Sequence, residues 1–189
     1  MSRLSVAVGL LLAGFALSTP GSADQTPAPT APASPNPILM LDTAKGVIEM
    51  EFLPADAPKS VAHVLALVGR NFYRGLRVHW AQPGVIQFGD PQTRDMTKLW
   101  SWGTGGSGRP VNVAEPSKRP FVRGSVGLAY QTGRPPTTGD SQIFLLRRAN
   151  PDLNGKYAML GRVTGGLDVL DKLAERDLIR QLVLKTDAP

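Results

Sequence analysis

The sequence predicts a mainly β fold, a closed antiparallel β-barrel capped by two α-helices. Two observations lead to this prediction. Short apolar runs follow one another along much of the chain, and the run at 47–52 has the alternation of a half-buried strand. Only two segments, 56–69 and 167–175, carry apolar residues at helical spacing. Many short strands with two peripheral helices are typical of a barrel with capped ends.

The first clear strand is predicted at 47–52. Its apolar residues alternate with Glu49 and Glu51, which is the period of two expected of a strand with one buried face. The segment 43–46 before it is predicted to be a hairpin turn, in which Gly46 supplies the unusual backbone angle. The strand therefore follows a tight turn.

The next segment predicts a helix over 56–69. Asp56 is expected to be its N-cap, Pro58 is tolerated in the first turn, and Gly69 lies close to the expected end. His63 occupies a polar position and is expected to be a surface histidine. The buried stripe is predicted from the spacing i, i+3, i+4 and i+7, at Val61, Val64, Leu65 and Val68.

The second half of the chain alternates strands with one long irregular region. A strand is predicted from about Leu76, and the region 92–123 that follows is rich in glycine, proline and charge without a clear period. Irregular chain of that length is usually functional or mobile. The later strands are predicted at 125–130, 141–146, 158–163 and 179–184. The helix at 167–175 is expected to bury Val169, Leu170 and Leu173.

The composition excludes several classes of function. The net charge of +6 comes from 21 basic and 15 acidic residues, and the basic residues are scattered instead of forming a stripe with aromatic residues. This pattern favours a solvated basic surface over a nucleic-acid interface. Without cysteine the chain has no disulfide, thiol nucleophile or thiolate metal site, and two histidines alone do not favour a zinc centre. No metal is expected.

The N-terminus predicts export. Residues 1–23 contain Arg3, an apolar run over 4–17 and the small residues of 21–23, which together resemble a cleavable signal peptide. The apolar run is shorter than the about 20 residues of a membrane span, so an uncleaved anchor is the less favoured alternative. We therefore expect a periplasmic or secreted protein with no membrane insertion after cleavage.

A tether is predicted between the signal peptide and the folded domain. Residues 24–37 are rich in proline and alanine and contain hardly any bulky apolar side chain. Such a segment cannot bury enough surface to offset its ordering entropy, and extended chain is expected. The domain boundaries are therefore 1–23 for the signal peptide, 24–37 for the tether and 38–189 for the barrel.

Two runs about fifty residues apart, 78–91 and 141–146, resemble the active-site strands of cyclophilin-type peptidyl-prolyl isomerases. Further segments follow the family's order, with Thr43, Gly46, Ile48, Glu51 and Pro54 for its opening motif, then 57–61, 72–75, 153–157 and 160–163. The chain is identified as a member of this family over roughly 39–184. The resemblance implies the cyclophilin-like antiparallel barrel and rotation about X-Pro amide bonds as the reaction.

Rotation about an X-Pro amide breaks no bond, so the resemblance implies no nucleophile, metal or cofactor. The barrier is about 20 kcal/mol, and the uncatalysed step takes tens to hundreds of seconds. Such a site seats the proline ring in an apolar pocket, holds the flanking backbone and favours the twisted amide. The partners implied are proline-containing polypeptides, here exported or partly unfolded proteins.

The resemblance also assigns residues to the site. Three lie at the positions that act on the amide: Trp80 at that of the family's arginine, Gln87 at that of the glutamine on the substrate backbone, and Phe144 at that of the aromatic floor. Those that line the groove for substrate binding are Ala129, Gln142, Leu153 and Tyr157. His79 matches a family histidine and is expected to be buried and structural.

Three departures from the family bear on activity. Trp80 replaces an arginine, and an indole offers one neutral N–H donor instead of a charged fork. Loss of several kcal/mol of transition-state stabilisation would slow catalysis about a hundredfold or more. The segment 83–87 is one residue shorter than in the family, which removes a pocket phenylalanine, and Asp152 replaces a tryptophan that contacts cyclosporin, so affinity for this drug is expected to be weak.

Other arginines are candidates to replace the missing one. Arg77 lies three positions before Trp80, so in a regular strand it points to the opposite face and is a poor candidate. Arg94, Arg109 and Arg123 lie in or beside the irregular region, and the sequence does not place them.

Two functions remain open from the sequence. The first is a monomeric peptidyl-prolyl isomerase, slowed by Trp80, that assists protein folding. The second is a non-catalytic chaperone or adaptor that binds proline segments on the same fold, since an added aromatic residue increases apolar contact without supplying charge. A Ser/His hydrolase is not favoured, because no Gly-x-Ser-x-Gly motif is present.

Overall fold

The computed structural model describes residues 36–131 and 133–186. The predicted signal peptide and residues 24–35 of the predicted tether lie outside the described residues. The last two tether residues are already bonded to the domain, because the Asn36 side chain donates to Glu51 and the carbonyl of Pro37 accepts from the N–H of Phe52. No described helix is long and apolar enough to cross a membrane.

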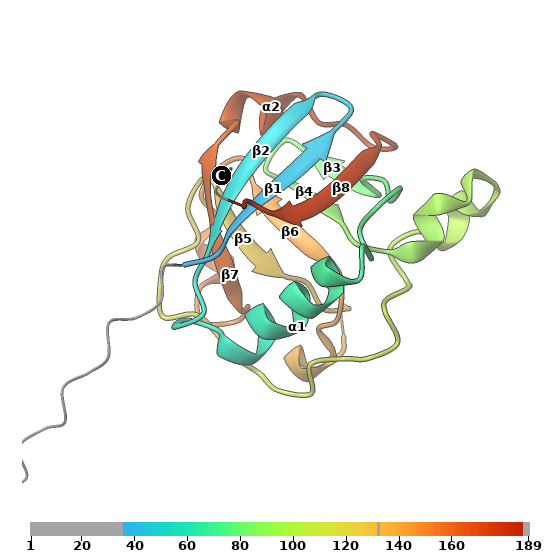
Figure 1. The fold of residues 1–189 in the computed structure, drawn as a ribbon. Coiled ribbons are helices and arrows are strands. Elements are labelled where there is room, and N and C mark those ends of the chain that lie inside the picture. Colours follow the sequence, from blue (N-terminus) through green and yellow to red (C-terminus); the bar gives the residue numbers. More distant parts are fainter. Residues whose placement is uncertain (1–35, 132, 187–189) are drawn as a thin grey trace, which may run out of the picture. The chain divides into compact units, whose positions relative to one another are not determined.

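Eight strands form one antiparallel sheet in the order β3-β4-β6-β5-β7-β2-β1-β8 (Figure 1). Their bounds are β1 (Ile38–Thr43), β2 (Gly46–Phe52), β3 (Trp80–Gln82), β4 (Val85–Phe88), β5 (Ser125–Leu128), β6 (Ile143–Leu146), β7 (Met159–Gly165) and β8 (Ile179–Leu184). Backbone hydrogen bonds between 75–78 and 176–179 connect the two ends of this order. The prediction of a mainly β, antiparallel fold is confirmed.

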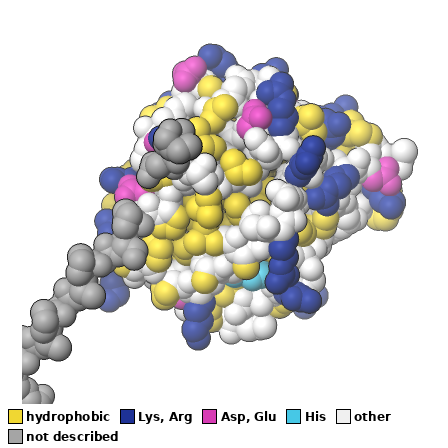
Figure 2. Space-filling model, viewed as in Figure 1, with side chains coloured by type: hydrophobic (Ala, Val, Ile, Leu, Met, Phe, Trp, Pro, Cys, Tyr) yellow, Lys and Arg dark blue, Asp and Glu magenta, His cyan; other side chains and the backbone are white. Residues whose placement is uncertain are grey.

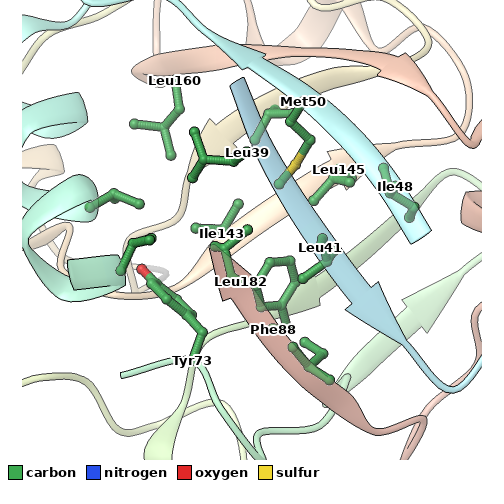
Figure 3. Packing of buried hydrophobic residues seen from close by; sticks show 14 of the residues in the cluster. Leu39, Leu41, Ile48, Met50, Tyr73, Phe88, Ile143, Leu145, Leu160 and Leu182 are labelled. Carbon is green, nitrogen blue, oxygen red and sulfur yellow. The ribbon is translucent and has the colours of Figure 1, made fainter. Parts of the chain in front are cut away.

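The barrel core lies on the inner face of this sheet (Figure 3). Alternate residues of each strand enter it, as the period of two requires. The ring of Tyr73 is fully buried there, and its hydroxyl donates to the carbonyl of Ser141, so the phenol is satisfied inside an apolar core. Burial strongly raises the pKa of Tyr73. The core includes Leu39, Leu41, Ile48, Met50, Phe88, Ile143, Leu145, Leu160 and Leu182.

Helix α1 (Pro58–Gly69) begins one residue later than the predicted cap requires. Ala57 is its N-cap, and the prediction that Asp56 caps the helix is wrong, because the carboxylate of Asp56 pairs with Arg119. The first N–H groups of the helix, those of Lys59 and Ser60, donate instead to the carboxylate of Glu115. A residue of the irregular region therefore supplies the cap.

The buried face of α1 follows the predicted stripe with one change. The fully covered apolar residues are Val61, Val64, Leu67 and Val68. Leu65, which the spacing places inward, is only half-buried and packs against the edge of the core. Gly69 is the last helical residue, as predicted.

The prediction of a strand from Leu76 is wrong for its first residues. The strand pair β3–β4 begins only at Trp80 and turns at 83–84, while residues 76–79 form an irregular segment with a single bridge from Arg77 to Leu178. The backbone bonds to 176–179 hold this segment, and the N–H of Arg77 donates to the hydroxyl of Thr93. The expectation of a regular strand through Arg77 therefore fails.

Helix α2 (Leu167–Lys172) is shorter than the predicted span of 167–175. Leu173 has extended backbone angles, which end the helix, yet it remains buried beside Leu170. Val169 is half-buried, so the predicted inward face is kept. In Figure 1, α1 and α2 lie at opposite ends of the sheet.

The irregular region contains two short 3₁₀ helices, η1 (Pro91–Arg94) and η2 (Met96–Ser101), followed by chain without regular structure up to β5. The region is therefore long and largely without regular structure, as predicted.

The basic side chains do not gather in one patch on the face of the molecule drawn in Figure 2. Lys and Arg side chains occur there at separate places, as their scatter along the sequence predicts.

Candidate active-site groove

The three residues assigned to the amide lie in one row across the sheet. Trp80 of β3 is directly opposite Gln87 of β4, Gln87 is opposite Phe144 of β6, and Phe144 is opposite Gly127 of β5. Directly opposite residues project from the same face, and neighbouring strands lie about 4.8 Å apart. The alternate residues of β4 and β6 enter the barrel core. The row therefore lies on the outer face of the sheet.

This outer face carries a groove of about 1030 Å³. All the residues that the sequence assigns to the site line it, namely Trp80, Gln87, Ala129, Gln142, Phe144, Leu153 and Tyr157. Residues that the sequence did not assign also line it, among them His79, Trp102, the loop 103–106, Tyr130, Arg134 and Asp140. In the sequence, the length of the irregular region 92–123 was the feature that indicated a functional role for the loop 103–106. The structure thus brings the predicted residues together and adds a polar rim.

The floor of the groove is an aromatic cluster separate from the barrel core. Phe144 is 5% exposed and contacts the rings of Phe121 and Tyr157 at centroid distances of 5.7 and 5.5 Å. A Cβ at Gly127 would lie 2.2 Å from Cζ of Phe144, so only glycine leaves room for this ring above β5. Ala129 and Leu153 complete the apolar wall. Together these side chains give the groove an apolar floor.

A pair of stacked tyrosines forms one wall. The rings of Tyr130 and Tyr157 lie 4.5 Å apart with an interplanar angle of 24°. Burial, and then the neighbouring Tyr130, raise the pKa of Tyr157, so its phenol stays neutral at ordinary pH. The wall therefore offers neutral aromatic surface and hydroxyl groups to a bound chain.

Two glutamines form the polar side of the groove. Nε2 of Gln87 donates to Oε1 of Gln142 at 2.6 Å, and Nε2 of Gln142 donates to the carbonyls of Gly103 and Gly105 at 2.8 and 2.7 Å. The amide of Gln142 is therefore fixed by three hydrogen bonds. Because Gln142 holds Gln87 through one N–H, the remaining donor and the Oε1 of Gln87 are oriented for a ligand backbone.

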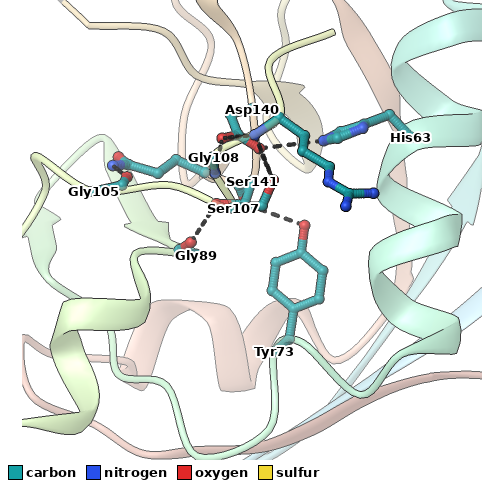
Figure 4. A network of polar contacts seen from close by, with 10 residues as sticks. His63, Tyr73, Gly89, Gly105, Ser107, Gly108, Asp140 and Ser141 are labelled. Atoms are coloured by element: carbon teal, nitrogen blue, oxygen red, sulfur yellow. Dashed lines mark hydrogen bonds and ion pairs between the residues drawn. The ribbon is translucent and has the colours of Figure 1, made fainter.

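Two aspartates hold the glycine-rich loop at the rim. Oδ2 of Asp90 accepts from the N–H groups of Gly103 and Gly105 at 2.7 and 3.0 Å. Oδ2 of Asp140 accepts from the N–H of Gly108 at 3.0 Å (Figure 4). Asp90 is fully buried, so its charge is balanced by backbone donors instead of by water. The loop is consequently a fixed part of the groove.

His63 is not the bare surface histidine that its position predicted. Its side chain is 18% exposed, and Nε2 lies 3.3 Å from Oδ1 of Asp140, which also accepts from the hydroxyl of Ser107 (Figure 4). Asp140 lies between Ser107 and His63, so the histidine does not contact the hydroxyl as a hydrolase relay requires.

Among the described residues, no cluster of three His, Asp or Glu side chains is placed to hold a metal ion.

None of the arginines named from the sequence lines the groove. The guanidinium of Arg94 donates to the carbonyls of Phe72 and Arg74, and that of Arg123 forms a double hydrogen bond with Asp171. Among the described arginines, only Arg134 lines the groove, from its exposed rim. Trp80 itself is 45% exposed there. The position of the family's arginine is thus occupied by neutral aromatic surface.

His79 lines the groove, and both of its ring nitrogens are buried. Burial lowers the pKa of His79, although the charge of Asp90 opposes the shift. In the unfolded chain a histidine titrates near pH 6.5. The folded protein therefore takes up its proton at lower pH than the unfolded chain does.

We expect His79 to make stability fall in acid. As the pH decreases from about 8 to 5, the unfolded chain binds the proton first, so the free energy of unfolding decreases through about pH 6.5. Urea unfolding in a His63→Gln background, with and without His79→Phe, isolates this histidine. The variant with phenylalanine should show a smaller decrease over this range. Equal slopes in both proteins would contradict a neutral buried His79.

Comparison with known proteins identifies the family. The family model described as cyclophilin type peptidyl-prolyl cis-trans isomerase/CLD matches residues 38–187. A probable peptidyl-prolyl cis-trans isomerase of Brucella abortus is 39% identical over 145 residues, which cover 75% of this chain and 73% of that protein. A peptidyl-prolyl cis-trans isomerase of Helicobacter pylori is 35% identical over 152 residues, covering 77% and 85%.

Solved structures agree on the fold. A cyclophilin type peptidyl-prolyl cis-trans isomerase of Cryptosporidium parvum superimposes with a TM-score of 0.69 at 23% identity, covering 81% of this chain and 99% of that one. The cyclophilin AquaCyp293 of Hirschia baltica gives a TM-score of 0.64 at 21% identity, covering 82% and 76%. The barrel, the ordered motifs and the family match over 38–187 lead to one conclusion: this chain belongs to the cyclophilin-type peptidyl-prolyl cis-trans isomerase family.

Proposed function

We propose that this protein catalyses cis-trans isomerisation of X-Pro bonds in exported or partly unfolded polypeptides. The observation that carries the proposal is the cross-strand row in which Gln87 lies directly beside Phe144. The row places an oriented amide next to an aromatic floor, which is the pairing needed to hold a peptide backbone while its proline ring is seated. Relatives at 35% and 39% identity are named as isomerases, which supports the same reaction here.

The site acts by binding the twisted amide better than the planar one. Phe144, Leu153 and Ala129 hold the proline ring, so the residue before it turns relative to a fixed ring. The amide of Gln87 holds the backbone beside it. Rotation removes conjugation from the nitrogen, and any donor that favours this state lowers a barrier of about 20 kcal/mol. Trp80 provides one neutral N–H for this purpose, so we expect a slow enzyme.

The part of the proposal that concerns export rests on residues 1–23, whose basic start, apolar run and small residues are those of a signal peptide. N-terminal sequencing of the protein isolated from its host is expected to read from Asp24. A sequence that begins at Met1 or Ser2 would remove cleavage of the signal peptide from the proposal, would favour the uncleaved anchor over it, and would leave the isomerase activity untouched.

The isomerase activity is tested by NMR exchange spectroscopy on a short X-Pro peptide with the chain that begins at Asp24. Cross-peaks between cis and trans signals should grow with enzyme concentration. Peptide shifts that saturate without exchange would support the second candidate, a binder of proline segments, which the half-exposed indole of Trp80 in the groove favours. The absence of both shifts and exchange would contradict both candidates.

A further inference from the structure

Three apolar side chains are exposed together on η2, and we call them the apolar tip: Met96, Leu99 and Trp100. Trp100 is 85% exposed, and Met96 and Leu99 are 42% and 40% exposed. Lys98, between Met96 and Leu99, has non-helical backbone angles, so the three side chains lie close together in sequence on a kinked element. Figure 1 shows the segment of η1 and η2 projecting away from the barrel. Single exposed apolar residues are common, but three within five residues on a projection mark an interaction surface.

Side chains next to the apolar tip hold η2 in place. Oδ1 of Asp95 accepts from the N–H of Thr97 at the start of η2, and the indole N–H of Trp102 donates to the carbonyl of Asp95 at 3.2 Å. The guanidinium of Arg94 lies over the ring of Phe72 and donates to the carbonyl of that residue. These bonds fix both ends of η2. Trp100 is therefore presented to solvent by an ordered element.

The same segment is continuous with the groove. Trp102 lines the groove and follows Trp100 by two residues, which span at most about 7 Å of chain. The next residue, Gly103, is bonded to Asp90 and packs against His79, where a Cβ would lie 3.3 Å from the imidazole. The apolar tip thus begins where the groove ends. A polypeptide in the groove needs only a few further residues to reach it.

We propose that the apolar tip is a second contact for polypeptide substrates, and that it binds an apolar side chain a few residues away from the proline. This inference rests on the proposed function of the groove. A chain anchored at both places binds more tightly because the second contact is intramolecular. An anionic membrane surface is a less suitable ligand for the tip than a polypeptide. The lysine beside the tip, Lys98, is paired through Nζ with the carboxylate of Asp95 at 3.2 Å, so its charge is already balanced.

The proposal is tested with a peptide series and one set of variants. Each fluorescent peptide has a single X-Pro bond in a Gly/Ser context, with one leucine placed three to eight residues before or after the proline, or with no leucine. The tip variant carries Met96→Ser, Leu99→Ser and Trp100→Ser. The matched control is Leu184→Ser, because Leu184 is 46% exposed at the end of β8.

For the parent and the control, we expect KM to be about tenfold lower for the best leucine spacing than for the peptide without leucine, with kcat unchanged. The tip variant should lose this gain and keep the kcat/KM of a short X-Pro peptide. Identical KM values in parent and tip variant at every spacing would overturn the inference. The inference is also overturned if the tip substitutions abolish binding to anionic phosphatidylglycerol vesicles, or self-association, while leaving every KM unchanged.

Failure of the two proposals is distinguishable. If the short peptide is isomerised but leucine spacing has no effect, only the second contact is excluded. If no peptide is isomerised, the function proposed for the groove fails, and dissociation constants of the same peptides, measured by fluorescence anisotropy, still test the tip. A tenfold preference that the tip variant loses would support it in that case as well.

Discussion

Substitution of Trp80 by arginine is expected to raise kcat/KM for a short X-Pro peptide by about ten- to a hundredfold. Trp80 is directly opposite Gln87 and is half-exposed at the groove, so an arginine at this position has room to reach the amide. A hydrogen bond from a charged donor contributes about 1.5–3 kcal/mol, which corresponds to this range of rates. NMR exchange with the same peptide measures the gain.

Two further variants at this position separate charge from geometry. Trp80→Lys supplies a charge without the planar fork and should gain less than arginine, because a lysine donates from a single point. Trp80→Leu removes the indole N–H donor and should be slower than the parent. If arginine lowers the rate while leucine leaves it unchanged, the indole acts through apolar contact, and the protein is better described as a binder of proline segments.

The outer row of the sheet could be predicted from the sequence because two kinds of signal agree there. Strand alternation separates Phe144 from its core neighbours Ile143 and Leu145, and the family motif assigns Gln87 to the same side. A strand pair fixes which residues are opposite each other once the motifs are recognised. The floor and the amide of the groove follow from those two facts.

The contacts of the irregular region could not be predicted, because they join residues far apart in sequence without a periodic pattern. Asp56 has the local pattern of an N-cap, yet Glu115, more than fifty residues later, supplies the two carboxylate oxygens. His63 looks solvated from its helical position, but Asp140 arrives beside it from the segment before β6. The helix and capping propensities of a short segment do not depend on residues far away in the sequence, so they do not predict these partners.

Phe144→Ala is expected to lower kcat/KM by about ten- to a hundredfold, because contact with a buried phenylalanine side chain contributes about 1.5–3 kcal/mol. The ring is the floor of the groove and is held between Phe121 and Tyr157, so no neighbour replaces it. The same substitution should cost about 3–5 kcal/mol of folding free energy, because it leaves a cavity. Urea unfolding and NMR exchange at low temperature measure the two effects separately.

Leu145→Ala is the matched control, since Leu145 lies on the same strand and is fully buried in the barrel core on the opposite face. It should lose about 2–5 kcal/mol of stability while its folded fraction keeps the parent's activity. Gly127→Ala provides a second test, because the added methyl group would collide with the Phe144 ring and displace the floor without removing it. Equal losses of activity in Phe144→Ala and Leu145→Ala, at equal folded fractions, would mean that the rate follows stability alone and that this face of the sheet does not hold the proline.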